Sequence, residues 1–84
     1  MNQNEFVEVA YRERIDPRAY SLDGGLVDNT LCLDTRADGS WVVYFSERGS
    51  RWDVSSFDTE SDALDFMLAK LVADSSVRLR ELDE

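Results

Sequence analysis

The stretch WVVYFSERGSRWD, residues 41–53, decides the fold of this chain. Residues 41–46 predict a strand, residues 47–50 a tight polar turn, and residues 51–57 a second strand. The first strand opens with an unbroken apolar run on both faces, which favours a central place in a sheet. Gly49 supplies the positive φ that the turn needs. The stretch therefore predicts a β-hairpin.

Outward from the hairpin, the chain predicts one more strand and two helices. Residues 30–35 read as a strand, and Asp38-Gly39 is the strongest short hairpin signal after it. An apolar stripe that starts at Phe6 predicts an N-terminal helix, which Pro17 stops because the residue before a proline avoids helical conformations. Thr59 is the expected N-cap of a second amphipathic helix.

These elements predict an α+β fold in a single domain, residues 1–84. We expect a helix, a three- or four-stranded antiparallel sheet and a second helix, with both helices on one face of the sheet. The expected core residues are Phe6, Ala10, Leu33, Val43, Phe45, Phe66, Met67 and Leu71. The tail after Asp74 alternates like a short strand but also suits a helical piece, so its conformation stays open.

Charge is the strongest compositional signal. Nine basic and 18 acidic residues give a net charge of −9. Nucleic acids and anionic membranes need a positive surface, so neither is an expected partner. A basic protein suits this charge, because opposite fields speed encounter. Solubility alone would also explain an acidic chain, and charge by itself does not decide between these explanations.

The cysteine and histidine content limits the covalent, catalytic and metal-binding chemistry that this chain can carry. Cys32 is the only cysteine, which excludes an internal disulfide and makes the cytoplasm the expected compartment. It lies between two leucines, so a small buried hydrophobe is expected rather than a reactive thiol. The N-terminal residues lack the signal-peptide pattern. There is no histidine, which removes the commonest general base and metal ligand.

Candidate site residues are acidic or aromatic, and each has a plain structural explanation. Glu47 and Arg48 at the hairpin tip most simply form a solvated turn. The acids from Asp53 to Asp65 lack the spacing and glycine of a calcium loop, and helix capping accounts for two of them. We therefore expect no catalytic residue, no metal site and no cofactor.

The hairpin also offers a candidate binding face. Helices on one face would leave the other face of the sheet open, and aromatic residues mixed with charges there are typical of protein-binding surfaces. Alternation puts Trp52 and Val54 on one face of their strand, with Arg51, Asp53 and Ser55 on the other. Several of Val42, Tyr44, Arg51, Asp53 and Ser55 are expected on the open face.

Three segments occur in an order that carries a family resemblance. They are YSLDGG at 20–25, WVVYFSERG at 41–49 and FDTESDA at 57–63. The chain resembles, over roughly residues 5–72, small immunity proteins of bacterial polymorphic-toxin and contact-dependent growth inhibition systems. The resemblance implies a cytoplasmic protein that binds and neutralises one cognate toxin domain. It transfers no catalytic residue, since such proteins are inhibitors, and it does not identify the toxin.

Two functions of different classes follow, with an enzyme as a distant third. The first is a toxin-neutralising immunity protein that blocks a basic toxin domain. The alternative is a small acidic interaction or regulatory subunit unrelated to toxins. Gene neighbourhood would separate them, because an adjacent toxin gene favours immunity. The expected partner-binding residues are Tyr44, Glu47, Arg48, Asp53, Asp58, Glu60 and Asp62.

Overall fold

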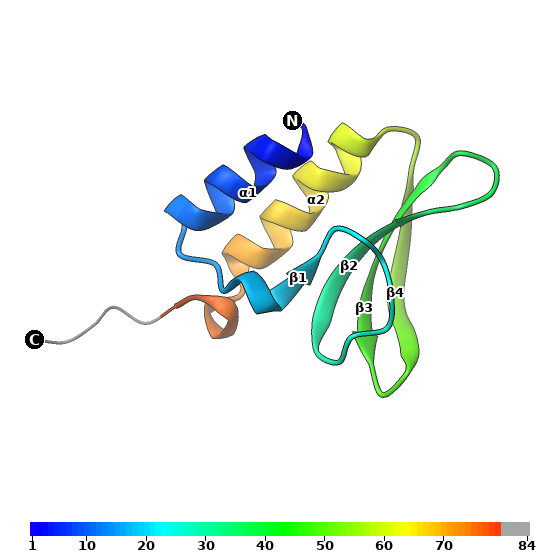
Figure 1. The fold of residues 1–84 in the computed structure, drawn as a ribbon. Helices are drawn as coiled ribbons and strands as arrows, with labels where there is room; N and C mark the ends of the chain where they lie inside the picture. The colour runs from blue at the N-terminus through cyan, green and yellow to red at the C-terminus, as the bar shows by residue number, and fades with distance from the viewer. Residues whose placement is uncertain (80–84) are drawn as a thin grey trace, which may run out of the picture.

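A computed structural model describes residues 1–79 and shows an α+β fold with two helices and a mixed four-stranded sheet (Figure 1). The elements in chain order are α1 (Gln3–Arg12), the short 3-10 turn η1 (Pro17–Ala19), β1 (Tyr20–Ser21), β2 (Thr30–Thr35), β3 (Trp41–Glu47), β4 (Ser50–Phe57), α2 (Glu60–Ala73) and a second 3-10 turn η2 (Ser75–Val77). The predicted class and element order are confirmed.

The sheet has the strand order β1-β2-β3-β4. The β3 strand runs antiparallel to both neighbours, as the two hairpin signals predict. The β1 strand, however, pairs in parallel with β2, with Tyr20 opposite Leu31. The expectation of a wholly antiparallel sheet is therefore wrong. Residues 22–29 make this parallel pairing possible, because they carry the chain back to the end of the sheet where β2 begins.

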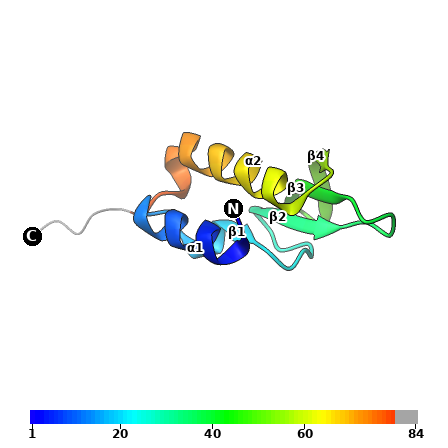
Figure 2. The same ribbon diagram turned by 90° about the horizontal axis from the view of Figure 1, so that it is seen from above.

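The two helices hold different positions relative to the sheet. Helix α2 lies over one face and contacts β2, β3 and β4. Helix α1 runs beside α2 and lies toward β1 (Figures 1 and 2). Phe6 of α1 meets Tyr20 of β1 edge to face, with ring centroids 5.1 Å apart. The expectation of both helices on one face of the sheet is therefore met by α2 and only loosely by α1.

Local sequence explains where the helices begin. Asn2 caps α1: its side chain accepts a hydrogen bond from the Glu5 amide at 2.8 Å, and the Glu5 carboxylate accepts one from the Asn2 amide at 2.9 Å. This reciprocal capping box satisfies two amide donors at the helix start. Thr59 caps α2 as predicted, with its hydroxyl accepting from the Asp62 amide at 3.1 Å.

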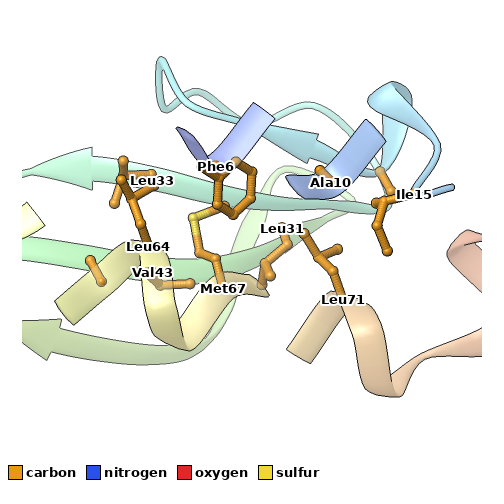
Figure 3. Packing of buried hydrophobic residues seen from close by; sticks show 11 residues of the cluster. Phe6, Ala10, Ile15, Leu31, Leu33, Val43, Leu64, Met67 and Leu71 are labelled. Carbon is orange, nitrogen blue, oxygen red and sulfur yellow. The ribbon is translucent and has the colours of Figure 1, made fainter. Parts of the chain in front are cut away.

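The main core lies where α1, α2 and the sheet meet (Figure 3). Phe6 of α1 lies next to Met67 of α2, with Leu31 of β2 close by. Six of the eight predicted core residues are buried, namely Phe6, Ala10, Leu33, Val43, Met67 and Leu71. The other two, Phe45 and Phe66, are only half-buried. These two side chains line a groove that is described below.

The opposite face of the sheet is covered. Residues 22–29, here called the strap, cross the face away from α2 (Figures 1 and 2). Cys32, Val42 and Tyr44 form a buried cluster there. The Tyr44 hydroxyl donates to the Gly25 carbonyl at 2.6 Å. The expectation of an open second face is therefore wrong for Val42 and Tyr44.

A close approach between the strap and β2 requires glycine. Gly24 has a φ of +73°, and a Cβ atom built on it would lie 2.6 Å from a carboxylate oxygen of Asp34. A side chain at this position would collide with the Asp34 side chain of β2 and strain the backbone. Packing of the strap onto the sheet thus explains Gly24, whereas Gly25, with nothing within 4 Å of a built Cβ, is explained by its own φ of +94°.

The tail after Asp74, which the sequence left open, starts as the single turn η2. Ile15 then forms an isolated antiparallel bridge with Arg78. This bridge joins the loop after α1 to the start of the tail. Residues 80–82, which the alternating pattern also covers, lie outside the described residues.

Cys32 should resist modification while the chain is folded. It is buried, and burial is the main cause that raises the pKa of its thiol. A raised pKa means less thiolate at a given pH, and thiolate is the species that reacts. We expect iodoacetamide at pH 8 to label Cys32 slowly in the native protein and rapidly in urea, as followed by mass spectrometry. Equal rates in both states would contradict its burial.

Candidate protein-binding surface

The predicted partner-binding residues do not form one cluster. Glu47 ends β3 and Arg48 lies in the β3–β4 turn, whereas Asp58 and the start of α2 lie at the other end of β4. Eight strand residues separate these ends. At about 3.3 Å per residue, the two groups are roughly 25 Å apart. The acids that adjoin in sequence therefore cannot all contact one small patch of a partner.

The turn residues have a structural part in holding the strap. Arg48 has a φ of +55° and Gly49 a φ of +76°, so both central residues of the turn are left-handed, as hairpin turns of this kind require. The Arg48 amide donates to a carboxylate oxygen of Asp28 at 2.7 Å, which ties the turn to the strap. The solvated-turn interpretation of Glu47 and Arg48 thus fits the geometry.

The acids at the start of α2 are also partly explained by local structure. Glu60 and Asp62 lie in the first turn, where the helix dipole favours negative charge. Glu60 accepts a hydrogen bond from the Gln3 side chain at 2.9 Å, which links the starts of the two helices. Asp58 and Asp62 are exposed. These acids contribute charge to this end of the molecule beyond their capping role.

The outer strand β4 is the most exposed regular element. It pairs with β3 on one side and is the last strand in the sheet order. Trp52 is 53% exposed and Val54 46% exposed. The indole N–H of Trp52 donates to the Glu47 carbonyl at 3.3 Å, which orients the ring along the strand. A large aromatic side chain held on an edge strand is a typical anchor of a protein interface.

A bulge in β4 changes the predicted faces. Trp52 lies opposite Phe45 and Ser55 lies opposite Val43, so Trp52 and Ser55 share the α2 face of the sheet. Simple alternation predicted opposite faces for these two residues, and that prediction is wrong. The register shift falls between Val43 and Phe45, across from Asp53. Asp53 has a φ of +53°, and a left-handed residue in a strand is a common way to make a bulge.

Arg51 stays on the strap side of the sheet. Its guanidinium lies 4.3 Å from the centroid of the Tyr44 ring, in a cation–π contact. It also reaches a carboxylate oxygen of Asp34 at 3.5 Å. Arg51 therefore packs over the predicted binding residue Tyr44, and it neutralises part of the negative charge on this face.

A groove opens on the α2 face next to Asp53. Its volume is about 450 Å³, within the size range of ligand and side-chain pockets. The apolar wall comprises Ala19, Leu31, Val43, Phe45, Phe66, Leu71, Ala73 and Val77. The polar rim comprises Asn29, Asp53, Lys70 and Asp74. A smaller hollow continues from it past Asn29 and Val77 to Asp16 and Arg18.

The charges along the groove differ in how they are compensated. Asp16 and Arg18 form an ion pair at 3.0 Å, and the hydrogen bonds from Arg18 hold the pKa of Asp16 below its ordinary value. Lys70 places its ammonium 5.3 Å from the centroid of the Phe66 ring. The Asp53 side chain has no hydrogen-bond or ion-pair partner among residues 1–79. The groove therefore carries an uncompensated acid beside an aromatic wall.

Sequence patterns did not single out this groove. Asp53 is a predicted binding residue, but Phe45 and Phe66 are predicted for the core, and no sequence pattern marks Lys70 or Asp74 as a site residue. Helical and strand periodicity marks a residue as facing inward. It does not distinguish a residue packed on all sides from one that borders a hollow.

No family model, no curated protein and no solved structure matches this chain. Within residues 1–79, no three cysteine or acidic side chains come together in a way that could hold a metal ion. None of the helices in that range has the length and apolar character needed to cross a bilayer.

Proposed function

We propose that this chain binds and neutralises a basic protein, as a toxin-neutralising immunity protein. The observation that carries the proposal is the surface formed by Trp52 and Asp53 on the exposed edge strand β4. It joins a half-exposed aromatic ring to an uncompensated carboxylate on a chain of net charge −9. Such a pairing suits a basic protein surface, which supplies both apolar contact and positive charge. The sequence resemblance supports the toxin as the specific partner.

The acids suggest how such an inhibitor would work. Proteins that cut nucleic acids carry basic grooves, because they must hold phosphates. An acidic domain can occupy such a groove with its carboxylates where phosphates would lie. Asp53 lies within the Trp52 surface, whereas Asp58, Glu60 and Asp62 lie at one end of β4. We therefore expect Asp53 to make direct contacts and the α2 acids to act mainly by steering the partner during approach.

The second candidate is an acidic regulatory subunit of a protein that is not toxic. The same surface would serve it, so the two candidates differ in the partner rather than in the fold. Both require a basic partner, and both are compatible with the predicted cytoplasmic location. Toxicity of the partner, expressed alone, separates them.

Co-purification tests the proposal. The full chain carrying an affinity tag is isolated from the cytosol of its native host, and the bound protein is identified by mass spectrometry. We expect a basic protein that stops growth when it is expressed without this chain. A captured protein that is acidic, or one that does not impair growth, would overturn the immunity proposal.

The association rate should depend on salt and on the charge at position 53. Opposite charges speed diffusional encounter, and salt screens this effect over a Debye length of about 8 Å at physiological ionic strength. We expect Asp53→Lys to slow association with the captured partner several-fold in stopped-flow or surface-based kinetics. Asp58→Lys and Glu60→Lys should also slow association, because those sites steer the partner, whereas Asp53→Lys should in addition speed dissociation, because a direct contact is lost.

Glu8→Lys is the matched control for this prediction, since it makes the same charge change on the exposed outer part of α1. It should change the rate only through net charge. Equal association rates for Asp53→Lys and Glu8→Lys would show that β4 is not part of the interface. Kinetics that do not respond to salt would contradict the electrostatic part of the proposal.

A further inference from the structure

The groove next to Asp53 has two chemically distinct parts. Its wall is apolar and includes the half-buried rings of Phe45 and Phe66. Its rim carries the acids Asp53 and Asp74 and a single lysine, Lys70. A ligand that fills it must present an apolar body to the wall and a polar head to the rim.

The rim favours a positive head. Asp74 is held ionised, because hydrogen bonds from the Ser76 hydroxyl at 2.6 Å and the Ser76 amide at 3.0 Å lower its pKa. Both bonds go to one carboxylate oxygen, and the other has no partner within the described part of the chain. Asp53 has none at all there. Two carboxylates against one ammonium leave this rim net negative.

The position of Asp53 at the groove follows from the bulge in β4. Left-handed conformations are costly for residues other than glycine, and they persist where the surroundings demand them. Asp53 adopts one at a φ of +53° without any local hydrogen bond to its side chain. The bulge interrupts the regular alternation of β4 and places Asp53 at the rim of the groove that Phe45 and Lys70 also line.

Other occupants fit less well. An anionic ligand would meet two carboxylates and only one ammonium. A purely apolar side chain would cover Asp53 and Asp74 without pairing them, which leaves buried charges unsatisfied. Arginine and lysine have both required parts, because their methylene stems lie along apolar surfaces while their charged heads reach polar groups.

We infer that this groove receives an arginine or lysine side chain of the basic partner. The stem lies along Phe45 and Phe66, and the charged head is held by the carboxylates of Asp53 and Asp74. Trp52, next to Asp53 on the edge strand, covers the segment of the partner that carries this side chain. This inference rests on the proposed function, since it names the anchor by which a basic partner is held.

The test uses a small probe and the full-length protein. Nα-acetyl-arginine methylamide is titrated into the isotope-labelled chain, and amide chemical shifts are followed by NMR. Nα-acetyl-citrulline methylamide, which has nearly the same shape but no charge, is the matched probe. We expect saturable shifts centred on Asp53, Phe66 and Lys70, with the arginine probe binding about tenfold more tightly than the citrulline probe, as one charge-assisted hydrogen bond at a partly exposed site would give.

Two protein variants locate the charged head. Asp53→Asn keeps a residue that tolerates the left-handed conformation, and Asp74→Asn keeps a side-chain oxygen for the Ser76 bonds. Each should weaken the arginine probe about threefold, because the two carboxylates share the tenfold advantage of the charged head, and leave the citrulline probe unchanged. Glu8→Gln removes one negative charge far from the groove and should leave both probes unchanged.

Three outcomes would overturn the inference: no saturable shifts, equal affinity for both probes, or shifts centred on the start of α2. Each outcome leaves the proposed function standing if the chain still captures and neutralises a basic toxin, because the partner would then be held elsewhere. Loss of that capture with intact probe binding would instead reject the function and keep the cation-binding groove.

Discussion

Replacing Phe6 by alanine should lower the free energy of unfolding by about 3–5 kcal/mol. Phe6 is fully buried, and it joins the core cluster shared by both helices and the sheet. Its ring also meets Tyr20 of β1 edge to face. A domain of this size has a total stability of about 5–10 kcal/mol, so the variant should be close to unfolding at ambient temperature. Urea melts monitored by circular dichroism measure the change.

Phe66→Ala is the matched control for this prediction. It removes the same ring from α2, but Phe66 is only half-buried and borders the groove. Less apolar surface is returned to water, and the space left is already open to solvent, so we expect about half the loss seen for Phe6→Ala. Equal losses would mean that the groove wall is as tightly packed as the core. A loss below about 1 kcal/mol for Phe6→Ala would contradict the placement of α1.

Tyr44→Ala should cost a similar amount, about 3–5 kcal/mol, and should release the strap. The Tyr44 ring is buried beneath residues 22–29, its hydroxyl holds the Gly25 carbonyl, and Arg51 covers the ring. Without the ring the strap loses both its packing and its hydrogen bond. Faster amide hydrogen exchange over residues 22–29, together with a lower urea midpoint, is the expected measurement.

Tyr44→Phe separates packing from hydrogen bonding. It keeps the ring and removes only the hydroxyl, so the expected cost is about 1 kcal/mol. Exchange in the strap should then rise near Gly25 and little elsewhere. A Tyr44→Ala variant as stable as Tyr44→Phe would show that the strap does not depend on the ring, and the second face of the sheet would have to be considered open.

The fold could be predicted where its signals are local. The turns at Asp38-Gly39 and Arg48-Gly49 need left-handed residues, so the glycines at these positions predict the hairpins directly. Thr59 predicts the start of α2 in the same way, because a hydroxyl at the N-cap accepts a hydrogen bond from a free amide of the first helical turn. Each of these signals spans only a few residues, and the contacts that it controls lie within the same few residues.

The features that sequence patterns missed depend on contacts that no local motif encodes. The parallel pairing of β1 and the strap across Tyr44 join residues that are 19 positions apart or fewer in sequence, yet no turn motif encodes them. The bulge at Asp53 shifts the register by one residue and so reverses the predicted faces. In the sequence, an acidic residue at a bulge cannot be distinguished from an exposed acidic residue in a regular strand.

The candidate site was predicted only in part for the same reason. The acids form one run in sequence, but the length of β4 separates them in space. Tyr44 was expected on an open sheet face, and the strap buries it. Of the predicted binding residues, Asp53 is the best placed for contact with a partner protein, because it lies beside the exposed Trp52 and the groove. The other residues of that groove come from α2 and β3, which no short motif connects.

Growth of cells that express the captured partner is the most direct test of the central claim, that the surface around Trp52 and Asp53 neutralises a basic toxic protein. The partner is induced alone, with the wild-type chain, or with a Trp52→Ala/Asp53→Lys double variant whose folded state has been verified by circular dichroism. We expect the wild-type chain to restore growth and the double variant to fail. Full restoration by the double variant, or no restoration by the wild-type chain, would contradict the claim.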